Sequence, residues 1–101
     1  MSQFDVLRTQ RSAIYPFVVD VQADLHSKLT TRVVVPLVSR SRYTQPTTRL
    51  TPIVNVGEDE YVAVFPLIAA IPKASLGPFV GSLALHRATL IAALDLLVTG
   101  S

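Results

Sequence analysis

The chain has 101 residues, of which half are hydrophobic and 16% are charged, with a formal net charge of +2 at pH 7. This length suits one domain over residues 1–101 and leaves no room for a separate catalytic lobe, and so small a charge is not the signature of a protein that binds nucleic acid directly. Because cysteine is absent, disulfides, thiolate nucleophiles and cysteine-based zinc sites are excluded.

The first part of the chain predicts three strands. Residues 4–8 alternate apolar and polar side chains, as a half-buried strand does, and residues 15–22 repeat this alternation more strongly. Residues 23–31 have no clean period and predict a loop. Residues 32–38 are apolar on both faces, which favours a central strand, but Pro36 has no backbone N–H and predicts a bulge or an edge there.

The second part predicts a hairpin, a short strand and a helix. Residues 39–49 are polar and predict an exposed segment with one helical turn. Two apolar runs within residues 50–65 flank Gly57 and predict a hairpin. Residues 68–71 predict a short strand before a connection rich in Pro and Gly. Residues 82–98 contain no Gly or Pro and many Ala and Leu, which predicts one C-terminal helix.

The predicted helix is apolar on more than one side. One stripe should pack on the sheet, yet the opposite side carries Ala84, Leu85, Ala88, Ile91 and Ala92. A surface helix normally divides more cleanly into apolar and polar faces. We therefore expect a two-fold homodimer that covers the excess apolar surface.

No motif predicts a catalytic centre, a cofactor or a metal. The chain lacks phosphate-loop, dinucleotide, nucleophile-elbow and zincin motifs, and its two histidines, His26 and His86, are far apart. The acidic run at 57–60 is more typical of a solvated turn than of a cation site. Asp20 or Asp24 beside an arginine is the remaining acid–base arrangement, but no spacing supports it.

The polar segment after the third strand contains a small basic patch. Arg40, Arg42 and Arg49, with Tyr43, could contact RNA or an acidic peptide. An ordinary polar loop over the sheet edge is the simpler interpretation.

No segment predicts export or membrane insertion. Asp5 interrupts the N-terminal residues, and the apolar stretch at residues 90–94 is far shorter than the roughly 20 residues of a membrane span. We expect a cytoplasmic protein without membrane contact.

Several short motifs occur along the chain in a characteristic order. They are MSQFDV, FVVDVQADL, RVVVPL, TPIVNVGEDEY, AAIP and a final helix that closes with Gly100. Over essentially the whole chain, these motifs resemble those of the CcdB toxins of bacterial toxin–antitoxin pairs. The second and third motifs are the most specific, because each joins a strand pattern to fixed polar or proline positions.

The resemblance implies a mainly β fold with one C-terminal α-helix, in which a small antiparallel, partly barrel-like sheet of the CcdB/MazF type forms a homodimer. It further implies a protein that is not an enzyme and has no cofactor. Such a toxin binds the A subunit of DNA gyrase, traps the gyrase–DNA cleavage complex and serves plasmid maintenance. A CcdA-like antitoxin neutralises it with a disordered tail that folds on binding.

The resemblance also implies a gyrase-binding site at the end of the chain. The family's fullest ending is an aromatic residue, glycine and isoleucine, whereas this chain ends in Thr99, Gly100 and Ser101. The changed ending lacks a cation–π contact worth roughly 1 to 2 kcal/mol and an apolar burial worth roughly 1.5 to 3 kcal/mol. The supporting positions are Leu25, His26, Asp95 and Val98.

Three further interpretations remain open. Gly100 could simply end the helix in a left-handed conformation, with residues 99–101 as its cap. The basic patch could belong to an mRNA endonuclease of the related MazF or Kid type. The altered ending could belong to a non-toxic homologue that binds antitoxins.

Overall fold

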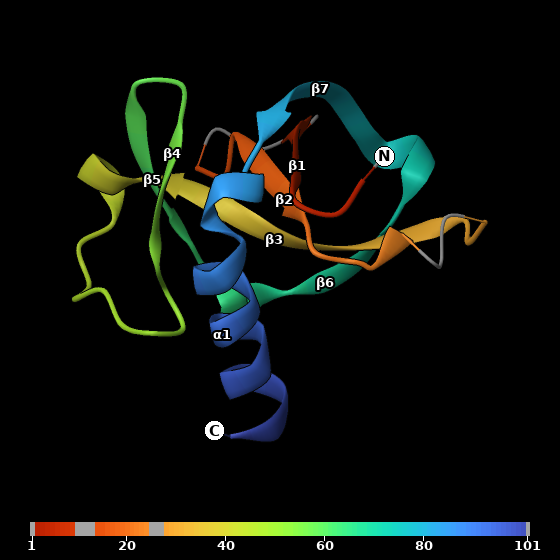
Figure 1. Ribbon diagram of the computed structural model, residues 1–101. Helices are drawn as coiled ribbons and strands as arrows, with labels where there is room; N and C mark the ends of the chain where they lie inside the picture. Colours follow the sequence, from red (N-terminus) through yellow and green to blue (C-terminus); the bar gives the residue numbers. More distant parts are fainter. Residues whose placement is uncertain (1, 10–13, 25–27, 101) are drawn as a thin grey trace.

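The computed structural model describes residues 2–9, 14–24 and 28–100. In these ranges, seven strands form one antiparallel sheet, and an α-helix lies at the C-terminal end (Figure 1). The strands are β1 (Asp5–Thr9), β2 (Phe17–Asp20), β3 (Thr31–Ser39), β4 (Ile53–Val56), β5 (Asp59–Ala63), β6 (Ala69–Pro72) and β7 (Leu76–Ser82). The remaining elements are the short 3-10 turns η2 (Arg40–Arg42), η3 (Phe65–Leu67), η4 (Lys73–Ser75) and η5 (Ala84–His86), and the helix α1 (Arg87–Thr99).

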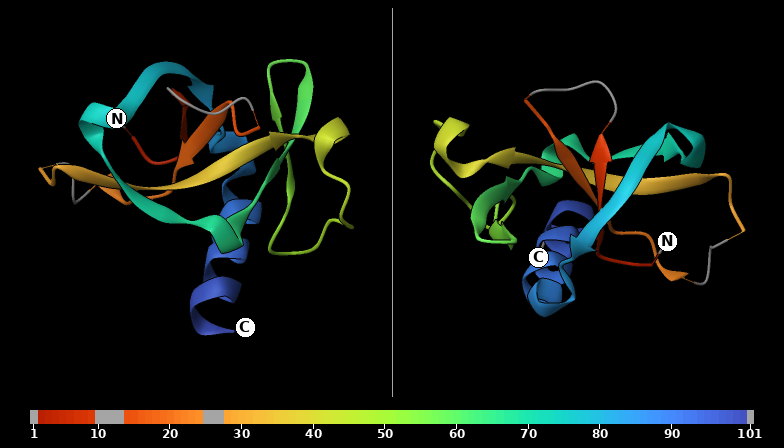
Figure 2. Two further views of the ribbon diagram at one scale, coloured as in Figure 1. Left: turned by 180° about the vertical axis from the view of Figure 1, so that it is seen from behind. Right: turned by 90° about the horizontal axis from the view of Figure 1, so that it is seen from above.

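The sheet is curled. Its strands follow the order β4–β5–β3–β2–β1–β7, and β6 pairs with the first part of β3. Figure 2 shows the β4–β5 hairpin and β7 on the same side of the long strand β3, which gives a half-barrel. The predicted fold class, mainly β with a partly barrel-like antiparallel sheet and a C-terminal helix, is confirmed. The homodimer stays a prediction.

The main core lies between the sheet and α1. It joins alternate residues of the strands, such as Val6, Val19 and Val35, to Leu90 and Ala93 of the helix. Partly buried side chains farther along α1 also pack against this cluster. Ile91, which we expected on the opposite side of the helix, belongs to the side that packs on the sheet, together with Leu94 and Leu97.

Strand β2 is buried on both faces, which differs from its predicted alternation. Val18 packs in a second cluster with Leu7 and Val34, while Phe17 and Val19 belong to the main core. Asp20, which we expected on the polar face, is buried. Its partner explains this, because the Nε atom of Arg32 on the neighbouring strand donates to its carboxylate at 2.7 Å.

Pro36 lies within β3 at a place where no ladder needs its missing N–H. It faces Val18 of β2 without a shift in register, so the predicted bulge is not found. On its other side, β3 pairs with β6 through residues 31–34 and with β5 through residues 37–39. The carbonyl of Pro36 accepts from the N–H of Val64, just after β5 ends. The proline therefore occupies the interval between two neighbouring strands, which acts as a local edge.

The C-terminal helix begins later than the sequence predicted. Ser82 is the last residue of β7, Leu83 is buried, and the 3-10 turn η5 precedes the start of α1 at Arg87. We predicted a mere connection where β7 pairs with β1. Gly77 and Pro78 are typical turn residues, so they concealed a strand whose pairing partner is some 70 positions earlier in the sequence. No helix in the described part of the chain is long and apolar enough to cross a membrane.

Candidate functional site

The last turns of α1 form an exposed tip. Asp95 and Thr99 are one helical turn apart, with Val98 beside them, so the three side chains share one face of the helix. All three residues are exposed, and Val98 keeps 73% of its surface accessible. Figure 1 shows the helix projecting away from the sheet toward its C-terminal end. The structure therefore brings these predicted site residues together on an accessible surface.

Gly100 closes the helix in the left-handed conformation. Its φ angle is 78°, and its backbone N–H donates to the carbonyl of Leu96 at 3.0 Å. The hydroxyl of Thr99 donates to the carbonyl of Asp95 at 2.6 Å. The predicted helix cap is therefore confirmed, and the same residues remain exposed.

The other three predicted site residues, Leu25, His26 and Ser101, lie outside the described residues. Asp24, which precedes Leu25 in the sequence, is held in place because its carboxylate accepts from the backbone N–H of Gln3 at 2.8 Å.

Gln3 connects this loop to the start of the helix. Its side-chain amide donates to the carbonyl of Val21 at 3.2 Å, and its side-chain oxygen accepts from Arg87 Nη1 at 3.1 Å. The Arg87 guanidinium also lies over the ring of Phe4, 5.6 Å from its centre. The N-terminal residues thus join the segment after β2 to α1.

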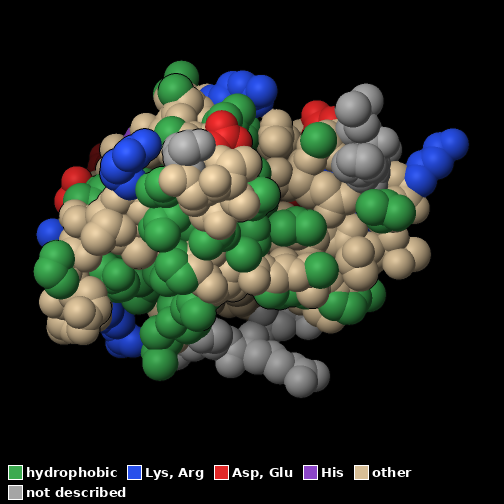
Figure 3. All heavy atoms as spheres, turned by 90° about the horizontal axis from the view of Figure 1, so that it is seen from below, with side chains coloured by type: hydrophobic (Ala, Val, Ile, Leu, Met, Phe, Trp, Pro, Cys, Tyr) green, Lys and Arg blue, Asp and Glu red, His purple; other side chains and the backbone are tan. Residues whose placement is uncertain are grey.

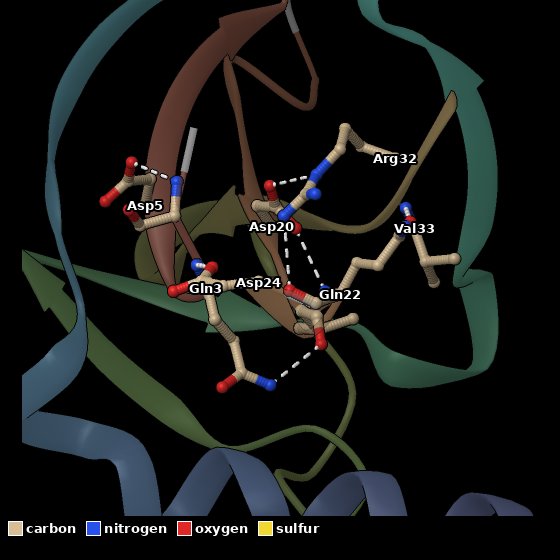
Figure 4. A network of polar contacts seen from close by, with 9 residues as sticks. Gln3, Asp5, Asp20, Gln22, Asp24, Arg32 and Val33 are labelled. Carbon is tan, nitrogen blue, oxygen red and sulfur yellow. Dashed lines mark hydrogen bonds and ion pairs between the residues drawn. The ribbon is translucent and has the colours of Figure 1, made fainter. Parts of the chain in front are cut away.

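A buried polar network supports the segment that follows β2 (Figure 4). Asp20 accepts from Arg32 and from the backbone N–H of Gln22, and Arg32 also donates to the Gln22 carbonyl at 3.2 Å. The side-chain oxygen of Gln22 accepts from the N–H of Val33. Because the Asp20 carboxylate is buried against Arg32, it is placed for a structural role, and the structure gives no support to the acid–base arrangement considered for it.

Arg40 and Arg49 of the predicted basic patch line two different hollows. Arg40 lines a shallow hollow beside the β4–β5 turn, whereas Arg49 lines a different one beside α1. The ring of Tyr43 packs against Val38 and neighbouring core residues, so it is only partly available for stacking on a base.

The acidic turn and the second histidine lie apart from the tip. Glu58, Asp59 and Glu60 are exposed in the hairpin, as a solvated turn predicts. His86 accepts from the backbone N–H of Asn55 through Nε2 at 3.4 Å. No group of three or more potential metal ligands occurs among the described residues.

A largely apolar surface lies on the side of the molecule at which α1 ends. Figure 3 views this side and shows hydrophobic side chains gathered across it. The turn η3 contacts α1 and leads into β6, an outer strand whose one partner in the described part of the chain is β3. We call this surface the apolar face and define it by three exposed residues of η3 and β6: Leu67, Ala70 and Pro72.

Sequence reasoning missed a pocket between the β4–β5 hairpin and β7. It is lined by residues of both, including Asn55, Tyr61 and Gly81. The missed strand β7 forms one of its walls, so the sequence offered no signal for it beyond an unexplained glycine.

The family comparison decides what this structure is. The family model described as CcdB protein matches residues 3–100. The chain belongs to the CcdB family. It is therefore a toxin of the toxin–antitoxin type, and the resemblance carried by its motifs is confirmed.

A solved structure shares this fold with the CcdB-family chain. It is an endoribonuclease in complex with its cognate antitoxin from Mycobacterial species, with a TM-score of 0.75 and 17% sequence identity, over 94% of this chain and 91% of that chain. Our prediction that the chain is not an enzyme is wrong. Since an endoribonuclease has the same fold, a lack of catalysis does not follow from it.

Proposed function

We propose that this chain, acting as a single CcdB-like domain, is a toxin that binds the A subunit of DNA gyrase and traps its cleavage complex. The observation that carries the proposal is the exposed tip of α1 in a chain that belongs to the CcdB family. Because gyrase acts on bacterial DNA, the proposal also places the toxin in the cytoplasm.

The proposed gyrase contact uses the exposed face of the tip. Val98 offers apolar surface, Asp95 offers a charge and Gly100 allows close approach to the backbone. Thr99 supplies no ring, so the contact must differ from the aromatic contact that the family resemblance implies. Leu25, His26 and Ser101 complete the proposed set.

The functional unit of this proposal is a homodimer. The apolar face exposes Leu67, with 48% of its surface accessible, beside the unpaired edge of β6. Apolar surface of this kind favours association. Because the apolar face lies on the side at which α1 ends, a dimer formed through this face would bring the two tips of α1 close together.

The test is calorimetric titration of the purified protein into the dimerisation region of gyrase A. Val98→Ser should weaken binding by about tenfold, since it removes roughly 1.5 kcal/mol of apolar burial. Leu85→Ser is the matched control, because Leu85 is also an exposed apolar residue but lies outside the tip. Absence of binding by both the natural protein and a Thr99→Trp, Ser101→Ile variant would contradict the proposal.

The second candidate function is endoribonuclease activity, which the fold shared with the endoribonuclease favours. Incubation of the purified dimer with end-labelled RNA tests it directly. Cleavage that is lost in an Arg40→Ala, Arg49→Ala variant would support this candidate over gyrase binding, whereas intact RNA would remove it.

The toxin assignment also includes a cognate antitoxin. The endoribonuclease with the same fold was solved with its own antitoxin, which supports the proposal that this chain has one. A disordered antitoxin tail can cover a large surface at modest affinity per unit area.

A further inference from the structure

A pocket of about 290 Å³ opens between the two ends of the curled sheet. Strands β4 and β7 are the first and last strands of the sheet order, and no pairing joins them in the described part of the chain. Figure 2 shows the hairpin and β7 on the same side of β3. The lining residues are Val6, Phe17, Asn55, Val56, Gly57, Asp59, Tyr61, Val80, Gly81, Ser82 and Leu83.

Gly81 explains why the space is empty. It pairs with Val6, and side chains of paired residues in an antiparallel ladder lie on the same face of the sheet. Val6 is buried in the core, so a side chain at position 81 would also point to the inner face. A Cβ atom built on Gly81 would meet no atom within 4 Å. The missing side chain at position 81 therefore leaves part of the pocket open.

The floor of the pocket is aromatic. The rings of Phe17 and Tyr61 meet edge to face, with centres 5.4 Å apart. Both residues line the pocket, next to the aliphatic side chains of Val6 and Leu83. The volume is slightly below the range of roughly 300–1,000 Å³ that is usual for small-molecule sites. An apolar side chain of a longer segment therefore suits the pocket better than a free cofactor.

The strand at one wall has backbone groups that face the pocket. The N–H of Ala63 donates to the carbonyl of Pro52, so alternate residues of β4 bond to β5 and Asn55 points the other way. Indeed, the Asn55 N–H donates only a long bond of 3.4 Å, to His86. An extended segment can pair with this edge once it displaces the His86 imidazole from the Asn55 N–H.

The rim of the pocket is negative. Asp59 lines it, and Glu58 and Glu60 flank Asp59 in the exposed turn. None of these three carboxylates has an ion-pair partner among the described residues. A segment that enters the pocket from this side would gain from a lysine or arginine next to its apolar residue.

We propose that this pocket binds an extended, basic segment of the antitoxin. An apolar or aromatic side chain of the segment fills the space beside Gly81 and stacks against Phe17 and Tyr61. Its backbone pairs with the outer edge of β4, and a neighbouring Lys or Arg reaches Asp59. This inference rests on the proposed function only in taking the partner to be an antitoxin, and the site is separate from the tip of α1.

The experiment uses a peptide of the inferred chemistry, Ac-Lys-Val-Phe-Val-Lys-NH2, and the matched peptide in which both lysines are glutamates. Each is titrated into the ¹⁵N-labelled full chain. We expect the basic peptide, at about 1 mM or below, to shift the amide signals of Asn55, Gly57, Val80 and Ser82, and to bind at least about tenfold more tightly than the acidic peptide.

Two variants test the geometry. Gly81→Phe should fill the pocket and abolish the shifts, while Gly81→Ala, which adds a single methyl group in open space, should retain binding. Asp59→Lys, in the exposed turn, should remove the preference, so that the basic and acidic peptides bind about equally. This variant tests the charge even if Gly81→Phe fails to fold.

Absence of shifts with the basic peptide overturns the proposal, and so does equal binding of the two peptides. Undiminished binding by a folded Gly81→Phe variant does so too. None of these peptide-binding measurements depends on gyrase. A protein that fails to bind gyrase but binds the peptide would refute the gyrase function alone, and the reverse result would refute the pocket alone.

Discussion

Replacement of Arg32 by methionine tests whether the buried ion pair organises the fold. Arg32 and Asp20 have completely buried side chains, and the Nε atom of Arg32 lies 2.7 Å from the Oδ2 atom of Asp20. Without the guanidinium, the Asp20 carboxylate would keep the N–H of Gln22 as its one donor among the residues that the structure describes. Breaking a buried pair by removal of one partner costs about 3–5 kcal/mol, which is a large part of the roughly 5–15 kcal/mol that stabilises a typical domain.

Urea unfolding measures this loss. For a slope of about 1–3 kcal/mol per molar urea, the midpoint should fall by at least about 1 M. Protein concentration must be equal in all samples, because a dimer's stability depends on it. Arg42→Met is the control, since Arg42 is exposed and its replacement should change stability by less than about 0.5 kcal/mol.

A double variant distinguishes the loss of the ion pair from the cost of leaving one unpaired charge buried. Arg32 Nη1 has no hydrogen-bond partner among the described residues, so the pair is incompletely satisfied. Asp20→Val with Arg32→Met removes both charges together, and it should recover most of the stability that the single change loses. If Arg32→Met alone costs less than about 1 kcal/mol, the reasoning from burial is refuted.

Three further changes probe other parts of the molecule. Gly77→Ala should lower the stability by about 1–3 kcal/mol in thermal unfolding, because its Cβ would clash with the carbonyl oxygen of Arg8; an unchanged midpoint would show that β7 adjusts freely. Gly100→Ala should cost about 1–2 kcal/mol in the same assay, since the left-handed φ of 78° strains alanine, and no loss would mean that the cap reforms. Leu67→Asp should convert a dimer to monomers in analytical ultracentrifugation, whereas Phe79→Asp, at an exposed apolar residue of β7, should not; a persistent Leu67→Asp dimer would place the interface elsewhere.

Local patterns predicted those elements that local chemistry determines. The hairpin followed from Gly57, whose φ angle of 63° is readily adopted by glycine, and β3 followed from its β-branched run. The family motifs supplied the fold class, and the gyrase-binding site at the chain end stays a prediction. The helix cap at Gly100 was predictable because glycine in this position has a known geometry.

Features that depend on distant contacts were not predictable in this way. Strand β7 contains Gly77 because the Arg8 backbone passes too close for a side chain, yet glycine reads locally as a turn. Asp20 looked like a surface residue because its partner, Arg32, belongs to the next strand. The pocket beside Gly81 depends on the curl of the whole sheet, which no single segment encodes.

The helix cap at Gly100 is made by the backbone and does not depend on the exposed side chains of the tip. The backbone of Gly100 closes the helix, and the exposed side chains of Val98 and Thr99 contribute little to the core. Substitutions on the tip can therefore accumulate at little cost to folding, and each can alter which partner surface is bound. Under the proposed function, the target specificity of this toxin can therefore change quickly while its scaffold stays under separate selection.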